Sequence, residues 1–171
     1  ADSIMAVYPY TPLNSITESI ISIASVPCFI GVGGGTTQGP RSRAIAYYAE
    51  LAGAYGVVVN GPIPHEDIEE ISKFVDIPVI ATVTSLKDDY KAKIAAGAEI
   101  LNVSGGKYTA DLVAHIRADI GYKFPIIATG GKDGKSILET IDAGANAISY
   151  TPPSSSDVFG SMMDKYRNED I

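Results

Sequence analysis

One phrase of sequence occurs three times along the chain, as Gly53-Ala54-Tyr55-Gly56-Val57-Val58-Val59, Gly97-Ala98-Glu99-Ile100-Leu101-Asn102-Val103 and Gly144-Ala145-Asn146-Ala147-Ile148-Ser149-Tyr150. Each copy opens with a glycine, which adopts the left-handed conformation at a helix end without steric cost. An apolar run follows almost at once. The phrase therefore predicts the end of a helix, a very short loop and a buried strand.

A second kind of strand alternates with the first, and each example is entered through a proline. The segments are Val26–Val32, Ile77–Val83 and Phe124–Thr129. Proline is tolerated at the first residue of a strand because no ladder donor is needed there. Both kinds of strand are continuous Val, Ile and Ala runs, which indicates parallel strands covered on both faces.

Apolar residues at three- and four-residue spacing predict helices between the strands. The predicted helices are Leu13–Ala24, Arg41–Ala52, Glu66–Val75, Leu86–Ala96, Ala110–Ile120, Gly134–Ala143 and Asp157–Tyr166. With Ile4–Val7 as a further strand, the chain has seven β/α units.

We expect an α/β fold, a parallel β/α barrel of the TIM type, formed as a single domain by residues 1–171. A closed barrel of this type has eight units, so we interpret the strands as numbers two to eight and the first unit as missing. An open doubly wound sheet is the alternative, but it needs a reversal of strand order that the uniform repeat does not suggest.

Charge and composition exclude several classes of protein. The net charge of −7 argues against a nucleic-acid or anionic-membrane surface, which needs clustered Lys and Arg. No apolar stretch approaches the ~20 residues that span a bilayer. Cys28 is the single cysteine and lies in an apolar run, so we expect a buried thiol and a cytoplasmic protein.

The last two strands carry the clearest ligand signal, because the loops after strands seven and eight of such barrels bind phosphate. Of these last two strands, the earlier one ends in a Gly-Gly pair. The later one leads into a Ser- and Pro-rich segment where a helix is predicted to start. Exposed N–H groups at a helix start favour anions. An ordinary cap by Ser154 or Asp157 is the alternative interpretation, and the two can coexist. The predicted phosphate-binding residues are Gly130, Gly131, Lys132, Thr151, Ser154 and Ser155.

The other strand ends supply further candidates. The predicted ligand-binding residues are Gly34, Gly35, Thr82, Ser104, Gly106 and Thr129, and the predicted catalytic residues are Lys107, His65, Asn60 and Tyr8. For His65 a role at the start of a helix is the alternative, and for Lys132 a solvated loop position. No carboxylate occurs at a strand end, so we expect no metal site.

At Ile126–Gly131 and Ala147–Ser155 the sequence resembles the phosphate-binding β/α-barrel superfamily, which includes ribulose-phosphate-binding barrels. Thr82–Ser85 with Leu101–Thr109 is also similar to the corresponding strands of N-acetylmannosamine-6-phosphate epimerases. That family is expected to carry an acidic residue on the seventh strand, where this chain has Thr129, and its catalytic lysine has no counterpart here. The resemblance therefore implies a phosphate site and does not imply the epimerase mechanism.

Three functions agree with these patterns. The first is an enzyme that acts on a small phosphorylated metabolite as a lyase or isomerase, without a cofactor. The second is a ligand sensor or regulatory barrel without catalysis. The third is an oxidoreductase that binds flavin mononucleotide, whose phosphate occupies the same kind of site in related barrels. Exposed barrel edges also predict a homo-oligomer.

Overall fold

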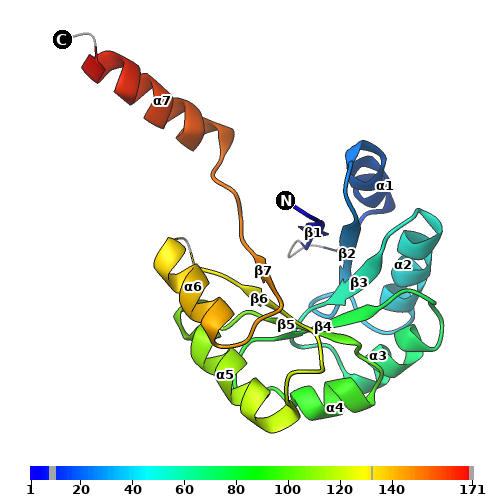
Figure 1. The fold of residues 1–171 in the computed structure, drawn as a ribbon. Helices are drawn as coiled ribbons and strands as arrows, with labels where there is room; N and C mark the ends of the chain where they lie inside the picture. Colours follow the sequence, from blue (N-terminus) through cyan, green and yellow to red (C-terminus); the bar gives the residue numbers. More distant parts are fainter. Residues whose placement is uncertain (8–10, 132, 170–171) are drawn as a thin grey trace.

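The computed structural model describes residues 1–7, 11–131 and 133–169, in which strands and helices alternate (Figure 1). The elements are β1 (Ile4–Ala6), α1 (Asn14–Ile23), β2 (Cys28–Gly33), α2 (Pro40–Leu51), β3 (Gly56–Val59), α3 (His65–Ser72), β4 (Val79–Val83), α4 (Tyr90–Ala95), β5 (Ile100–Val103), η1 (Gly106–Tyr108), α5 (Thr109–Ile120), β6 (Ile126–Thr129), α6 (Gly134–Asp142), β7 (Ala147–Ser149) and α7 (Ser155–Glu169). Every helix and strand predicted from the sequence is present.

The strands form one seven-stranded sheet in the order β1-β2-β3-β4-β5-β6-β7, and all neighbours are parallel. The sheet is curved, and helices α1 to α6 lie around its outer face (Figure 1). Within the described residues β1 and β7 are not paired with each other. The absence of any reversal of strand order excludes the doubly wound alternative and confirms the parallel barrel architecture.

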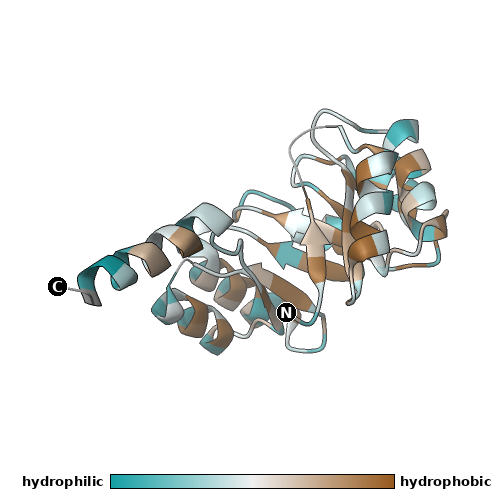
Figure 2. Cartoon of the chain, turned by 90° about the horizontal axis from the view of Figure 1, so that it is seen from above, coloured by the Kyte–Doolittle hydropathy of each residue, from teal (hydrophilic) through white to brown (hydrophobic). Residues whose placement is uncertain are grey.

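The hydrophobic core lies between the sheet and the surrounding helices. Val57 and Val59 of β3 belong to it, together with Ile68 and Ile71 of α3. Val58 is equally buried but lies outside this cluster, because successive side chains of a strand point to opposite faces. Apolar residues therefore fill both faces of the central strands, as the continuous runs predicted, and Figure 2 shows apolar segments along the strands.

A buried arginine ties together the amino-terminal ends of the last strands. Arg117 of α5 is 3% exposed. Its guanidinium group donates to the carbonyl oxygens of Gly121 (3.0 Å), Phe124 (2.6 Å) and Gly144 (2.8 Å) and to Oδ1 of Asn146 (2.6 Å). This group therefore supports the structure at the end of the barrel opposite to the predicted ligand site.

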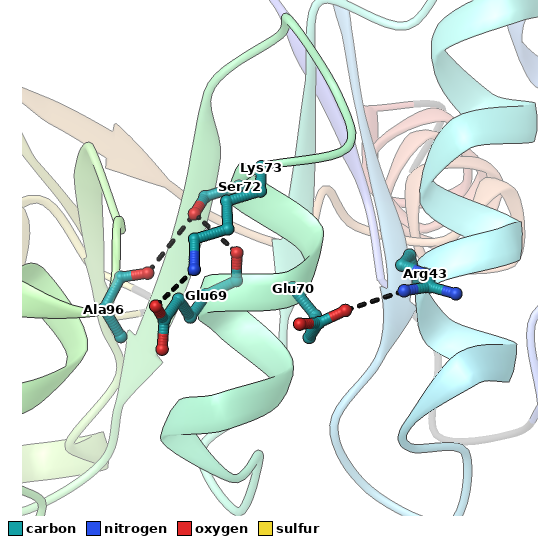
Figure 3. Close-up of polar contacts among 6 residues, drawn as sticks. All are labelled: Arg43, Glu69, Glu70, Ser72, Lys73 and Ala96. Carbon is teal, nitrogen blue, oxygen red and sulfur yellow. Dashed lines mark hydrogen bonds and ion pairs between the residues drawn. The ribbon is translucent and has the colours of Figure 1, made fainter.

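Polar contacts on the outer surface connect α2, α3 and the end of α4 (Figure 3). Arg43 and Glu70 form an exposed ion pair of 2.7 Å between α2 and α3. Ser72 donates its hydroxyl to the carbonyl oxygen of Ala96 at 3.3 Å. Gly97 has a φ of +108°, and a Cβ atom there would lie 2.3 Å from Oγ of Ser72. The repeated glycine is thus required both by backbone conformation and by the close approach of α3.

Helix α7 stands apart from the other helices, at the end of an extended segment that follows β7 (Figure 1). Each side chain described between residues 155 and 168 is exposed. The helix predicted at Asp157–Tyr166 is confirmed, but it does not cover the barrel. Its exposed apolar residues are Val158, Phe159, Met162, Met163 and Tyr166.

Two further findings bear on the expectations from composition. Cys28 is 3% exposed, and burial raises the pKa of its thiol. The predicted buried cysteine is therefore confirmed. Among the described residues no helix has the length and apolar character needed to cross a lipid bilayer.

Candidate functional site

Amide and hydroxyl side chains lie at the carboxyl ends of strands β3 to β7, and we call this group the polar layer. It consists of Asn60, Thr82, Asn102, Thr129 and Ser149. Their neighbours along the strands belong to the helix-side core or pack against it: Val59, Ala81, Val83, Leu101, Val103, Ala128 and Ile148. Because side chains alternate across a strand, the polar layer faces the interior of the barrel.

The sheet register brings members of the polar layer side by side. Thr82 lies opposite Asn102, and Thr129 lies opposite Ser149. Nδ2 of Asn102 donates to Oγ1 of Thr82 at 3.2 Å, and the hydroxyl oxygens of Thr129 and Ser149 are 3.4 Å apart. The layer is therefore a set of interacting uncharged groups from adjacent strands.

Asn102 has one polar atom that the described residues leave without a partner. Thr82 and Asn102 are each 8% exposed, and Oδ1 of Asn102 accepts no hydrogen bond from the part of the chain that the structure describes. An unpaired buried acceptor costs about 1–3 kcal/mol. Such a group is typical of a place where a ligand or an ordered water completes the network. The sequence did not single out Asn102 as a site residue.

The loop between β2 and α2 is fixed against the polar layer. Gly34 is buried with a φ of +98°, and a Cβ atom there would lie 2.7 Å from the backbone nitrogen of Asn60. That nitrogen donates to the carbonyl oxygen of Gly33 at 2.8 Å. Gly35 is exposed and lies next to the Asn60 side chain, because its own Cβ would be 3.8 Å from Nδ2. Gly34, Gly35 and Asn60 are therefore brought together, as members of one predicted site should be.

The loop after β5 contains three predicted residues, of which one reaches the strand ends. The N–H of half-buried Ser104 donates to the carbonyl oxygen of Val83 at 2.8 Å. Gly106 is exposed in η1, with a φ of +61°. The ammonium of Lys107 lies 4.9 Å from the centre of the exposed Tyr108 ring. Lys107 is thus a solvent-facing residue of the loop in this structure.

The Gly-Gly pair after β6 lies beside the end of β7. The N–H of Gly130 donates to the carbonyl oxygen of Ser149 at 2.9 Å. A Cβ atom on Gly131 would lie only 2.0 Å from Oγ of Ser136 in α6. Close packing therefore already requires this glycine, in addition to any role in phosphate binding.

Among the described residues, no hydrogen bond connects the Ser- and Pro-rich segment with the Gly-Gly pair. Thr151, Ser154 and Ser155 are exposed, and the last two lie where the separated helix α7 begins (Figure 1). Ser154 caps that helix: its hydroxyl donates to Oδ2 of Asp157 at 2.6 Å and accepts from the N–H of Asp157. In this structure Ser154 therefore acts as a helix cap, as the alternative interpretation of the sequence expected.

Of the remaining predicted residues, the structure describes His65. His65 is half-buried and is the first residue of α3, so it occupies the helix-start position that the sequence offered as an alternative. Tyr8 and Lys132 lie outside the described residues. In the described part of the chain no group of three or more His, Cys, Asp and Glu side chains could hold a metal ion.

A buried cation at the strand ends comes from a helix. Lys93 of α4 is 2% exposed, and its ammonium donates to the carbonyl oxygens of Gly61 and Thr82, each at 2.7 Å. Burial lowers the pKa of Lys93, while the charge of nearby Asp88 opposes the shift. Lys93 was not predicted as a site residue, because it occupies an ordinary position in a predicted helix and follows no strand directly.

Asp88 lies in the loop between β4 and α4. Its Oδ2 atom accepts from the N–H and the hydroxyl of Thr84, at 2.6 and 2.9 Å, and from the N–H of Ser85 at 3.3 Å. Burial pushes the pKa of this carboxyl up, but the hydrogen bonds from Thr84 and Ser85 and the charge of Lys93 outweigh that effect. The pKa therefore lies below its ordinary value.

The chain was compared with known proteins in sequence and in structure. No protein-family model matches the chain, and no curated protein matches its sequence. Solved structures do match. A 2,3-dimethylmalate lyase, described as a member of the PEP mutase/isocitrate lyase superfamily, superposes with a TM-score of 0.72 over 99% of this chain and 74% of its own, at 15% identity. The fold is a TIM barrel.

Two other solved structures are similar to this TIM barrel. A phosphonopyruvate hydrolase has a TM-score of 0.66 and 16% identity, over 92% of this chain and 66% of its own. A phosphoenolpyruvate phosphomutase from Streptomyces platensis subsp. rosaceus has a TM-score of 0.63 and 14% identity, over 91% and 64%. The chain thus spans about two thirds of the length of these two structures. The TIM-barrel part of the resemblance is thus confirmed, whereas none of these three structures is described as a ribulose-phosphate-binding barrel.

Proposed function

We propose that the carboxyl-end rim of the barrel binds a small phosphorylated metabolite and that the protein acts on it as a lyase or isomerase. The observation that carries the proposal is the polar layer, in which adjacent strands direct uncharged hydrogen-bonding groups to one place and Oδ1 of Asn102 lacks a partner. TIM barrels bind their substrates at this end. The structural neighbours named as a lyase, a hydrolase and a phosphomutase agree with this kind of chemistry.

Within this proposal the predicted residues have distinct roles. The N–H of Gly131 would approach the phosphate closely, as glycine amides do in anion sites, beside Gly130, whose own N–H donates to the carbonyl oxygen of Ser149. Thr82, Thr129 and Asn60 would orient the rest of the ligand from the polar layer. Lys107 and His65 are the described candidates for proton transfer, and both would have to turn toward the ligand from the loops that hold them.

The proposal is tested by binding. Inorganic phosphate and a set of phosphorylated three- to six-carbon sugars and oxo acids are titrated into the protein and followed by calorimetry and thermal unfolding. A ligand at 100 times its dissociation constant stabilises the native state by about 2.7 kcal/mol. Thr129→Val should weaken that ligand, whereas Thr36→Val, at an exposed position of the loop after β2, should not. If none of these compounds binds, the proposal is wrong.

A ligand sensor is the second candidate, and the composition of the polar layer favours it. The layer contains no acid or base, and Lys107 is exposed on its loop. A sensor would bind a phosphorylated metabolite and leave it unchanged, so product detected by mass spectrometry after incubation removes this candidate. The same sample tests flavin mononucleotide, since a colourless protein that does not bind added flavin is not a flavin enzyme. Light scattering tests the predicted homo-oligomer.

A further inference from the structure

Lys93 lies beneath the proposed ligand site, between the ends of two neighbouring strands. Its ammonium bridges the carbonyl oxygens of Gly61, just after β3, and Thr82, near the end of β4, with two hydrogen bonds of 2.7 Å. The side chains of Asn60 and Thr82 belong to the polar layer on either side of this bridge. Lys93 therefore fixes the spacing of the two strand ends that carry them.

The charge of Lys93 is only loosely balanced. Within the described residues no carboxylate lies close enough to form an ion pair with it. Asp88 is the acid whose charge acts on it, and that carboxylate is occupied by Thr84 and Ser85. A buried ammonium is costly unless it is paired or well hydrogen-bonded. An anion bound at the rim would supply the missing negative charge.

Lys93 also differs in its exposure to solvent from Lys107, the cation predicted from the sequence for this rim. Lys107 is exposed and faces solvent beside Tyr108, where water screens its charge. Lys93 is 2% exposed, so its field reaches the polar layer through protein rather than through water. Charges act more strongly across such a medium.

We infer that Lys93 is a positioning residue of the ligand site, which holds the ends of β3 and β4 in place and attracts the anionic group of the ligand. The inference rests on the proposed function and names the charge that the proposed site otherwise lacks. Lys93 does not touch the ligand. Its ammonium is within hydrogen-bonding distance of the Thr82 backbone, so a ligand bound to the Thr82 hydroxyl would lie roughly 8 Å away.

The size of the effect follows from that separation. Two opposite unit charges about 8 Å apart, in a medium of intermediate dielectric constant, change a binding constant by about five- to thirtyfold. Removing the charge should therefore weaken anion binding by that factor. The negative charge of Asp88 partly offsets the positive charge of Lys93. Removing the charge of Asp88 should therefore strengthen anion binding, by about two- to threefold.

The experiment measures the affinity of inorganic phosphate by calorimetry for the wild type and for Lys93→Met, Asp88→Asn and Lys91→Met. Asn suits position 88 because all three hydrogen bonds end on Oδ2, and a single amide oxygen can accept them. Lys91 is the matched control, since it is on the same helix but exposed and paired with Asp119 at 2.7 Å. Circular dichroism and urea unfolding show whether each variant is folded.

The inference predicts weaker phosphate binding for Lys93→Met, stronger binding for Asp88→Asn and an affinity within twofold of the wild type for Lys91→Met. Asp88→Asn changes the charge at the rim without removing the buried Lys93 side chain, so its gain measures the electrostatic part of the inference apart from any structural role of Lys93. An unchanged or weaker affinity in Asp88→Asn overturns the inference. This result decides the matter even if Lys93→Met does not fold. Wild-type affinity in a folded Lys93→Met also overturns it while leaving the proposed function intact. A wild type that binds neither phosphate nor any phosphorylated compound removes both.

Discussion

Replacing Asn102 with Leu and Thr82 with Val should make the unliganded barrel more stable. The double change removes a buried acceptor without a partner, which costs about 1–3 kcal/mol, and one hydrogen bond, which contributes about 0.5–1.5 kcal/mol. Leu has the branching of Asn, and Val that of Thr, so the packing shape is retained. The balance is a gain of about 1 kcal/mol, or 2–4 °C in the melting temperature of a chain of this size.

Urea unfolding followed by circular dichroism gives the free energy of unfolding of the double variant. The matched control is Thr109→Val: Thr109 is 3% exposed, and its hydroxyl donates to the carbonyl of Gly106 at 2.8 Å and accepts from the N–H of Gly105 at 3.1 Å. This control should lose about 1–2 kcal/mol. A loss of 1 kcal/mol or more in the double variant would refute the reasoning, since Oδ1 of Asn102 would then have a partner in the free protein. Ligand binding should fall in the double variant whatever its stability.

Three further predictions concern the scaffold. Arg117→Met should reduce the free energy of unfolding by about 3 kcal/mol or more in urea titrations, because it removes the four hydrogen bonds that this buried guanidinium donates to part-buried acceptors. Arg43→Met, at an exposed ion pair, should cost less than about 1 kcal/mol, and equal losses would contradict this ranking. Gly97→Ala should reduce the free energy of unfolding by about 2–3 kcal/mol in the same assay, since the φ of this residue is strained for alanine and the new Cβ would meet Ser72. Adding Ser72→Ala to the Gly97→Ala chain should recover part of the loss. Ending the chain after Pro153 should move the calorimetric melting temperature by less than about 2 °C, because the described side chains of α7 are exposed; a larger fall would mean that a surface in solution covers this helix.

Much of the fold could be predicted from local signals. The Gly-Ala phrase identified the helix ends, and Gly53, Gly97 and Gly144 indeed have φ values of +99°, +108° and +106°. The proline-entered strands at Val79 and Ile126 begin directly after their prolines. Both signals act over a few residues, where backbone sterics alone decide the conformation.

The site was less predictable, because its chemistry depends on contacts between elements. Nothing in the local sequence shows that Lys93, at an ordinary helical position, reaches across to the end of β3. The strand pattern places Asn102 on the inner face, but only the packed structure shows that its Oδ1 has no partner. The apolar positions of α7 predicted a helix correctly, yet such a pattern does not specify which surface the helix covers.

The linear strand order has a consequence for the speed of folding. Each strand pairs with the strands before and after it in the sequence, at separations of about 20 to 30 residues, and no described pairing joins the two ends of the sheet. The entropy of closing a loop rises with its length, so the sheet forms by a series of short closures instead of one that spans the chain. We therefore expect a low relative contact order for a parallel sheet, and folding in which a pair of adjacent β/α units can nucleate the rest.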